Sequence, residues 1–471
     1  MASIEFSHPY LPITSDSEKE MLEAINKESL EDLFCNIPEE FRLKHELDLP
    51  ESHTEMEVAA RIRELAGKNM PSTSGRVFLG AGVGIHYIPA VVSSLASRSE
   101  FLTSYTSYQP EISQGMLQTL FEYQSFMAEL LEIDVVNSSM YDMATALGEA
   151  AKMATRVKKG RSKFLVPGTI NPINLKVLHT YTDPVGIEVE QVEYDSKSGL
   201  LSLSDLESKL DDQVAGVYVE NPSYLGFLET QVDQIEEATH QAGALLVAGV
   251  DVLSLGLIRP PGDYSADIVI GEGQVLGSPI TYGGPLLGIF GCIDDMKIIR
   301  QMPGRLVGIT RTTDEPHEQG FVLTLSPREQ HIRRERATSN ICSNQAIAAV
   351  TAAIYIAVMG PVGIRQLSET IALKSNYAAK MIDEIPGAKA PSIGSSFWKE
   401  FVVTFENNTT AHHVHSELLK KGFHGGKILT NEFPRLGESM LFCVTEFHSE
   451  DAIVGMAGAL RDILTNGGGA K

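Results

Sequence analysis

Five short apolar segments between residues 163 and 272 constrain the fold more than any other feature of this sequence. Helical stretches separate these segments, which are "KFLVPG", "GIEVEQVEY", "VAGVYVEN", "ALLVAGVD" and "ADIVIGE". Short strands rich in β-branched residues that alternate with helices indicate β-α-β units. In such units, helices cover both faces of a mostly parallel sheet. We therefore predict an α/β fold. Such sheets bind ligands at the carboxyl ends of their strands, so the loops after "VAGVYVE" and "ALLVAGVD" are candidate sites.

The flanking segments predict two further regions. Residues 1–70 contain capped, amphipathic helical segments such as "HTEMEVAARIRELAGKN", and we expect a helical N-terminal arm. Residues 71–330 form the large α/β domain. Residues 331–471 begin with an apolar helix that ends at Gly360 and Pro361, and strands and helices follow it. This last region predicts a smaller C-terminal α+β domain.

Composition excludes several classes of protein. The net charge of −23 argues against a nucleic-acid partner, which would require a basic face. The four cysteines are scattered and form neither a disulfide framework nor a zinc motif. The N-terminal segment lacks an apolar signal core, and we expect no membrane span. We therefore expect a cytoplasmic protein.

Two motifs suggest ligands but also have simpler interpretations. The stretch "FLGAGVGIHY" (78–87) resembles a dinucleotide loop, but Ile85 stands where the third glycine is required. The alternative is a tight loop whose backbone approaches something closely. In "AHHVHSE", His412 and His415 share one helical face without the spacing of a metalloprotease site. Solvated surface histidines are the alternative there.

Three polar loops are further candidates. "NPSYLGFLE" (221–229) follows a strand and either lines a cofactor pocket or only connects to the next helix. "SYTSYQPEISQG" (104–115) either contacts a small anionic substrate or a ring, or only caps and packs. The loop 325–346 either holds an anion or compensates charge, and its basic residues are Arg328, His331, Arg333, Arg334 and Arg336.

The stretch "GEGQVLGSPITYGGP" (271–285) is the most informative. In pyridoxal-phosphate (PLP) enzymes of the aspartate-aminotransferase type, a strand-end aspartate pairs with the pyridinium nitrogen, and the next strand or loop carries the Schiff-base lysine. Asp251 ends one predicted strand and matches this aspartate. Between Asp251 and Asn340 the only lysine is Lys297, which lies in a charged, helix-like segment. The expected lysine position has Gln274, and its amide cannot form an imine.

At these residues the chain closely resembles a known family, the P-protein of the glycine cleavage system, or glycine dehydrogenase (decarboxylating). The likeness is to subunit 1 of its two-chain form. It runs nearly end to end and includes "LPITSDSEKEMLEAI", "FLGAGVGIHYIPAVV", "SYTSYQPEISQGMLQTLFEYQ", "GEGQVLGSPITYGGPLLGIFG" and "REQHIRRERATSNICSNQA". The resemblance implies a PLP-dependent aspartate-aminotransferase-like (fold type I) large domain.

The resemblance also implies a function. In this family, subunit 2 carries PLP on a lysine shortly before a glycine-rich run, and aligning that run with "YGGP" places Gln274 at the lysine position. Together the subunits decarboxylate glycine, release CO2 and pass the aminomethyl group to the lipoyl arm of H-protein. The family further implies an α2β2 assembly. It also implies that "SYTSYQPEISQG" reaches the partner's active site. The residues carried over to that shared site are Tyr105, Tyr108, Gln109 and Glu111.

The sequence departs from the family pattern in places. It has "GTINP" at 168–172, where a histidine often precedes the proline, and "GVDVLSLGL", where A-D-P is frequent. Three hypotheses therefore stay open. The chain is a subunit without its own PLP, a self-sufficient PLP enzyme that uses another lysine, or a structural partner that binds no substrate.

Overall fold

The computed structural model describes residues 10, 13–45, 47–104, 107–341, 345–394, 396–406 and 408–466. The chain divides into two compact units, Met1–Asn69 and Met70–Lys471, and each is described by itself.

The first unit is helical. Helix α1 (Ser15–Ala24) is capped by Thr14, whose hydroxyl accepts a hydrogen bond from the Ser17 N–H. Helix α2 (Glu55–Ala66) carries a capping box formed by Thr54 and Glu57. Between these helices the structure has the short 3-10 turns η1 (Leu30–Phe34) and η2 (Glu39–Phe41).

The second unit is built around a central sheet. Within the described residues, seven strands form it in the order β1-β7-β6-β5-β4-β2-β3. Strands β2 to β6 are parallel to their neighbours, whereas β7 pairs antiparallel with both β6 and β1. The strands are β1 (Val135–Val136), β2 (Lys163–Pro167), β3 (Glu188–Val192), β4 (Val214–Glu220), β5 (Leu245–Asp251), β6 (Ile268–Glu272) and β7 (Gly288–Cys292). All five predicted strands are confirmed, and with them the mostly parallel α/β fold.

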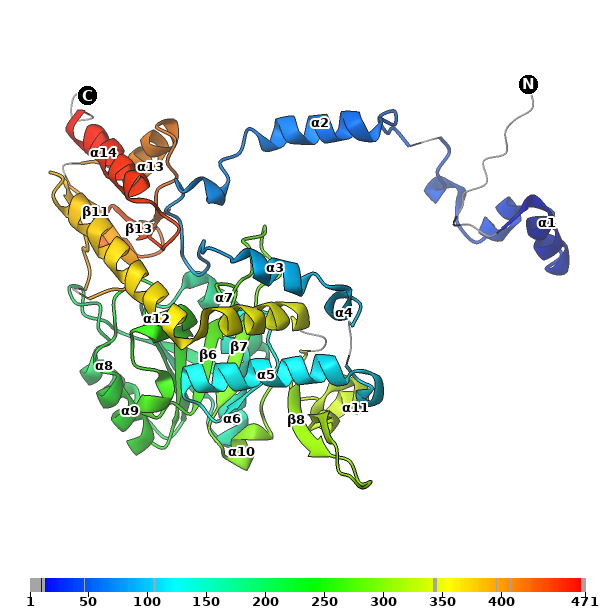
Figure 1. Cartoon of the computed structure of the whole chain (residues 1–471), viewed down its shortest axis with the longest axis horizontal. Helices are drawn as coiled ribbons and strands as arrows, with labels where there is room; N and C mark the ends of the chain where they lie inside the picture. Colours follow the sequence, from blue (N-terminus) through cyan, green and yellow to red (C-terminus); the bar gives the residue numbers. More distant parts are fainter. Residues whose placement is uncertain are drawn as a thin grey trace. The chain divides into compact units, whose positions relative to one another are not determined.

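Side chains of the strands alternate between two apolar clusters. Along β5, Leu246 and Ala248 face one cluster, whereas Leu245 and Val247 face the other. This period of two on a fully buried strand explains why each segment reads as a continuous apolar run. Helices α5 to α9 pack against the central sheet, and the unit contains further helices (Figure 1). The helices of the unit are α3 (Ala90–Ala96), α4 (Ser99–Leu102), α5 (Gln114–Leu131), α6 (Met143–Val157), α7 (Pro172–Thr182), α8 (Leu203–Lys209), α9 (Val232–Gln241), α10 (Met296–Ile299), α11 (Gln330–Arg333), α12 (Ala346–Asp383), α13 (Ala411–Lys420) and α14 (Glu450–Asn466).

Helix α12 corrects one expectation. Among the described residues it is long and apolar enough to cross a membrane, although the sequence analysis expected no such segment. Half of that apolar window is buried within the protein, and α12 packs against α3 and α5 (Figure 1). The helix is interrupted at Gly360, which has φ 60° and ψ 178°, and Pro361 opens its second half.

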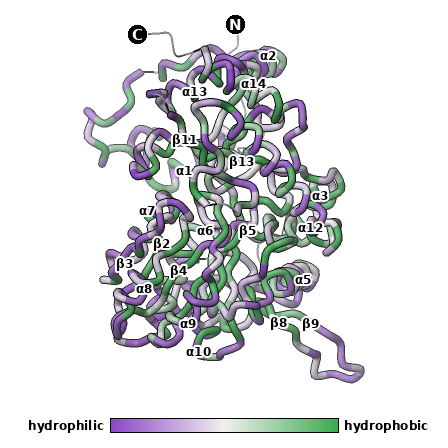
Figure 2. The backbone as a smooth tube through the Cα atoms, turned by 90° about the vertical axis from the view of Figure 1, so that its left-hand side faces the viewer, coloured by the Kyte–Doolittle hydropathy of each residue, from purple (hydrophilic) through white to green (hydrophobic). Residues whose placement is uncertain are grey.

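A second, antiparallel sheet lies C-terminal to α12. Its order is β10-β11-β13-β12, and its strands are β10 (Ala388–Lys389), β11 (Glu400–Phe405), β12 (Lys427–Ile428) and β13 (Ser439–Cys443). Strands β8 (Leu306–Arg311) and β9 (Gln319–Thr324) form a separate hairpin. Figure 2 shows that this hairpin runs out to a hydrophilic tip.

The loop after β4 approaches β11 so closely that it requires glycine. A Cβ on Gly226 would lie 1.9 Å from the backbone oxygen of Glu400, and Gly226 has φ +94°. We expect Gly226→Ala to lower the free energy of unfolding by more than about 3 kcal/mol, because backbone strain and a backbone clash add. Gly186, with φ +72° and open space around it, is the matched control. Gly186→Ala should cost only about 1–2 kcal/mol in the same denaturant titration. If both variants lost the same free energy of unfolding, the close approach of Gly226 to the Glu400 backbone would be contradicted.

Candidate functional site

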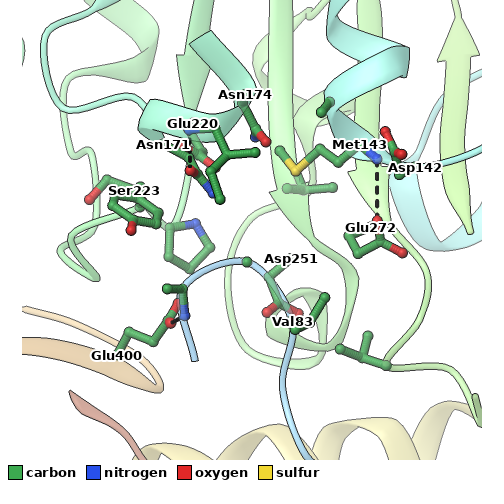
Figure 3. A pocket seen from close by; sticks show the side chains of 18 of the residues that line it. Val83, Asp142, Met143, Asn171, Asn174, Glu220, Ser223, Asp251, Glu272 and Glu400 are labelled. Atoms are coloured by element: carbon green, nitrogen blue, oxygen red, sulfur yellow. Dashed lines mark hydrogen bonds between the residues drawn. The ribbon is translucent and has the colours of Figure 1, made fainter. Parts of the chain in front are cut away.

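A cavity of about 340 Å³ opens at the carboxyl ends of three neighbouring parallel strands (Figure 3). Each of these strands ends in a carboxylate, namely Glu220 on β4, Asp251 on β5 and Glu272 on β6. The other walls come from the loop 81–83, the first residues of α6 and α7, and residues 398–400 next to β11. The cavity thus lies where a parallel sheet places its ligands.

A buried ion pair occupies the floor of this cavity. The Lys399 ammonium contacts the Asp251 carboxylate, and the two side chains are only 9 % and 19 % exposed. Burial by itself would lower the pKa of Lys399, but Asp251, Cys443 and Glu400 together outweigh burial and hold the pKa above its ordinary value. Lys399 therefore stays charged and is no nucleophile. Sequence reasoning missed it, since that reasoning searched for lysines only between Asp251 and Asn340.

Gln274 is fixed in place two residues after β6. It is 1 % exposed. Its side-chain Nε2 donates to the Ser278 carbonyl at 2.7 Å, and its Oε1 accepts a long hydrogen bond, 3.4 Å, from the Gly84 N–H. The amide therefore ties the loop after β6 to the glycine-rich loop.

Two carboxylates surround the N-terminus of α6. Asp142 is the N-cap and accepts from the Thr145 N–H at 2.7 Å. Glu272 accepts from the backbone N–H of Met143 at 3.2 Å (Figure 3), and also from those of Gln274 and Leu287 at 3.0 and 2.9 Å. Burial raises the pKa of Glu272 to about 7, although these backbone donors oppose the rise. A helix N-terminus that would suit a phosphate is thus already satisfied by protein carboxyl groups.

The residues of the cavity do not fit PLP. The aspartate suited to a pyridinium nitrogen is paired with Lys399. Gln274, two residues after β6, carries an amide that cannot form an imine, and a phosphate at α6 would meet the carboxyl groups of Asp142 and Glu272. Within the part of the chain that the structure describes, this cavity offers no free lysine, because Lys399 is the one lysine that lines it.

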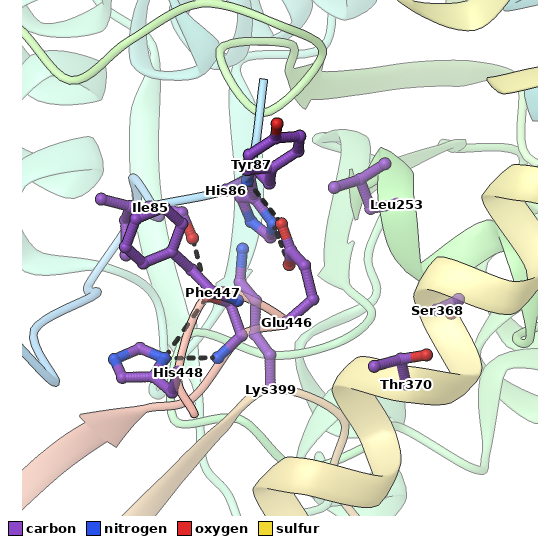
Figure 4. A network of polar contacts seen from close by, with 12 residues as sticks. Ile85, His86, Tyr87, Leu253, Ser368, Thr370, Lys399, Glu446, Phe447 and His448 are labelled. Carbon is purple, nitrogen blue, oxygen red and sulfur yellow. Dashed lines mark hydrogen bonds and ion pairs between the residues drawn. The ribbon is translucent and has the colours of Figure 1, made fainter. Parts of the chain in front are cut away.

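The glycine-rich loop 78–87 closes one side of the cavity, as the tight-loop interpretation predicted. A Cβ on Gly80 would lie 2.3 Å from Glu400 Oε1 and 2.6 Å from the Cys443 Cβ. The Ala81 N–H donates to the same Glu400 oxygen at 2.6 Å. Glu446 holds the end of the loop, since it pairs with His86 Nδ1 at 2.9 Å and accepts from the Tyr87 N–H at 2.6 Å (Figure 4).

The loop "NPSYLGFLE" also lines the cavity, whereas the cofactor that its motif suggested stays a prediction. Pro222, Ser223, Tyr224 and Gly226 all belong to the wall. Glu220, just before the loop, is a buried acid. Burial, with the nearby Glu400 carboxylate, raises its pKa to about 8, and a hydrogen bond from the Tyr224 backbone opposes the rise.

The polar loop 104–115 lies elsewhere on the second unit. Tyr105 is outside the described residues. Tyr108 stacks under the Arg305 guanidinium at 4.2 Å, and Arg305 donates a hydrogen bond to its hydroxyl. Gln109 and Glu111 are exposed. None of these described residues lines the cavity, so the structure does not bring them to Gln274.

Anchors hold both ends of this segment. The Gln114 side chain exchanges two hydrogen bonds with the backbone of Phe321 on β9, at 2.8 and 2.9 Å. Arg305, which holds Tyr108, is itself 4 % exposed and lies 3.5 Å from Glu329. The exposed side chains therefore project from a fixed loop.

The other candidates are dispersed. Arg328 donates to the Gly304 carbonyl at 2.9 Å, and burial lowers its pKa to about 10. Arg333, Arg334 and Arg336 are exposed, and the side chain of His331 is outside the described part. His412 is exposed, and His415 lies against His424 at 5.2 Å. No group of three metal-ligating side chains occurs among the described residues, and Lys297 is exposed on α10.

Comparisons with known proteins agree with this architecture. The family model described as "Glycine cleavage system P-protein" matches residues 8–457. A protein of Staphylothermus marinus, named probable glycine dehydrogenase (decarboxylating) subunit 1, is 46 % identical over 466 residues, which cover 97 % of this chain and 98 % of that protein.

Solved structures give the same result. The crystal structure of glycine decarboxylase (P-protein) of the glycine cleavage system, in inhibitor-bound form, has a TM-score of 0.85 and 39 % identity, covering 97 % of this chain and all of that one. A sphingosine-1-phosphate lyase from Burkholderia pseudomallei has a TM-score of 0.62 at 13 % identity, with 89 % and 92 % covered, and shares the fold alone.

The first prediction concerns the buried ion pair. Lys399→Met leaves the Asp251 charge buried without its partner, and we expect it to lower the free energy of unfolding by about 3–5 kcal/mol. Adding Asp251→Asn should restore most of this loss, so a double-mutant cycle in denaturant gives a strong coupling. Lys420→Met, which breaks an exposed pair with Glu417, is the control and should cost less than about 1 kcal/mol. If the two substitutions lowered the free energy of unfolding additively, the ion pair between Lys399 and Asp251 would be contradicted.

The second prediction concerns Glu220. Because its folded pKa is raised from 4.5 to about 8, its contribution to stability is fully present below pH 4.5 and is lost as the pH rises to 8. Glu220→Gln mimics the protonated acid. It should stabilise the protein relative to wild type by up to about 1.4 kcal/mol per pH unit across this window. Thermal melts at pH 6 and pH 9 measure the change. Glu207→Gln, at an exposed site, should show no such trend.

Proposed function

The chain belongs to the glycine cleavage system P-protein family, and from this premise we propose that it is the subunit of a heteromeric glycine dehydrogenase (decarboxylating) that binds no PLP itself. Its partner, subunit 2, binds the cofactor, and this chain completes the active site of that partner. The observation that carries the proposal is the Asp251–Lys399 ion pair, because it occupies the one carboxylate suited to a pyridinium nitrogen. Gln274 supports it, since its amide is bound by Ser278.

The shared site is formed by the loop 104–115 in this proposal. Tyr108, Gln109 and Glu111, with Tyr105, contact the glycine-binding site of subunit 2. Two features support this. Residues 108–114 lie outside the chain's own cavity, and they are anchored at Gln114 and, through Arg305, at Tyr108, while Gln109 and Glu111 remain exposed. A fixed loop of this kind positions a substrate without losing conformational entropy on binding.

The overall reaction follows from the family. In the assembled enzyme, PLP on subunit 2 supplies the electron sink for loss of CO2 from glycine. The aminomethyl group passes to the lipoyl group of H-protein. This chain orients the substrate and contributes hydrogen-bonding groups, and by itself it has no decarboxylase activity. We further propose an α2β2 assembly in the cytoplasm.

Spectroscopy of the purified chain tests the assignment of the cofactor. With PLP added, the chain alone should show no absorbance of a lysine-bound cofactor and no glycine–bicarbonate exchange. Both should appear when subunit 2 is added. Absorbance that borohydride fixes onto the isolated chain would instead show that another lysine binds PLP, and the proposal would be wrong.

Substitutions in the loop separate a shared active site from a structural role. In the reconstituted complex, Tyr108→Phe and Glu111→Gln should lower kcat/KM for glycine by about tenfold to a hundredfold, because a misplaced substrate loses rate steeply. Size-exclusion chromatography should show that the complex still forms. The controls Tyr377→Phe and Glu237→Gln make the same changes on α12 and α9. Turnover equal to that of the controls would favour a structural partner that contacts no substrate.

A further inference from the structure

Two polar groups on the wall of the cavity have no hydrogen-bond partner. They are Oε2 of Glu220, the last residue of β4, and Oγ of Ser223 in the loop that follows (Figure 3). Ser223 is 5 % exposed, so solvent does not satisfy its hydroxyl. A buried polar atom without a partner costs about 1–3 kcal/mol, and native proteins contain few of them. Two in one cavity point to a ligand that supplies the missing contacts.

The other carboxyl groups of the cavity each have a partner. Asp251 is paired with Lys399, and Glu272 accepts from three backbone N–H groups. Asp142 accepts from Thr145 and Glu400 from Ala81. The place that lacks a hydrogen-bond donor is therefore the corner formed by Glu220 and Ser223.

Charge and size define what could fill this corner. Five carboxyl groups and one ammonium line the cavity. An ammonium ligand beside Glu220 would stabilise the ionised form of that carboxyl group, whereas an anionic ligand would meet further negative charge. No group of three His, Cys, Asp or Glu side chains is arranged for a metal among the described residues. The volume of about 340 Å³ lies at the small end of ligand sites. The remaining wall is mostly apolar, with Ile173, Val177, Val250, Val275, Leu286 and Trp398.

We propose that this cavity binds a small primary ammonium compound with a short apolar body. Its ammonium group donates hydrogen bonds to Glu220 Oε2 and Ser223 Oγ, and its apolar part contacts the aliphatic wall. The inference rests on the proposed function in one respect, since a cavity that held PLP would have no room for such a ligand. The cavity is then a separate small-molecule site in this subunit, on a chain whose proposed catalytic contacts come from the loop 104–115.

The chain contains its own probe of this cavity. Trp398 is the only tryptophan in the sequence, is 1 % exposed and belongs to the cavity wall. We would titrate the purified full chain with n-propylammonium chloride and follow tryptophan fluorescence and heat release. Propan-1-ol has a similar size without the charge, and propionate reverses the charge. We expect a saturable signal for propylammonium and none for the other two at equal concentration.

Variants test where the ammonium binds. Glu220→Gln keeps the shape but removes the carboxyl group that an ammonium ligand would hold in its ionised form, and Ser223→Ala removes one acceptor. We expect the affinity for propylammonium to fall at least about tenfold for Glu220→Gln and several-fold for Ser223→Ala, with Glu207→Gln unchanged as the control. Circular dichroism shows whether each variant is folded, and Ser223→Ala is a second test if Glu220→Gln is not.

The outcomes separate this inference from the proposed function. No saturable signal from propylammonium, an equal response to propan-1-ol, or full affinity in both variants would each overturn the inference. PLP is titrated into the same preparation. If PLP gives the absorbance of a lysine-bound cofactor, the proposed function fails as well. If neither PLP nor propylammonium binds, only the ammonium site is wrong.

Discussion

The ion pair between Lys399 and Asp251 is the interaction on which the arrangement of the site depends. It joins the residue before β11 to the last residue of β5, and so connects the second sheet to the central sheet across the cavity. Both charges are largely buried, and a buried charge without a partner costs several kcal/mol. Each residue therefore constrains the position of the other. The same contact supports the proposal that this chain binds no PLP, because an aspartate that already holds a protein cation is not available to a cofactor.

The contacts around the ion pair also direct polar groups of the protein toward one another. The glycine-rich loop brings its backbone N–H groups to Glu400 and Gln274, at positions where a Cβ on Gly80 would not fit. Glu272 uses its carboxyl group to bind three backbone N–H groups around α6. In a cofactor enzyme such donors and charges would face the ligand, whereas here they bind one another. The fold is thereby retained with a cavity in which the carboxyl groups of Asp142, Asp251, Glu272 and Glu400 bind protein groups, whereas Glu220 Oε2 and Ser223 Oγ have no partner.

The sequence predicted the sheet well because buried parallel strands leave a continuous apolar signature. All five segments became strands of the central sheet. The family assignment rested on long motifs and agrees with the comparisons. The antiparallel strand β7 and the hairpin β8–β9 were not predicted, since their short segments carry no clear period. The length and apolar character of helix α12 were not recognised in the sequence. A buried core helix and a membrane span can have the same composition.

The site was harder to predict for a physical reason. Asp251 and Gln274 could be placed from strand ends, since neighbouring parallel strands bring their carboxyl ends together. Lys399 lies far away in the sequence, and only the packing of β11 against the central sheet brings its ammonium to Asp251. No local pattern marks such a contact. Gln274, at the position expected for the lysine, is the part of the proposal about PLP that the sequence could give. The part that needed the structure is Lys399, whose charged ammonium pairs with the Asp251 carboxylate.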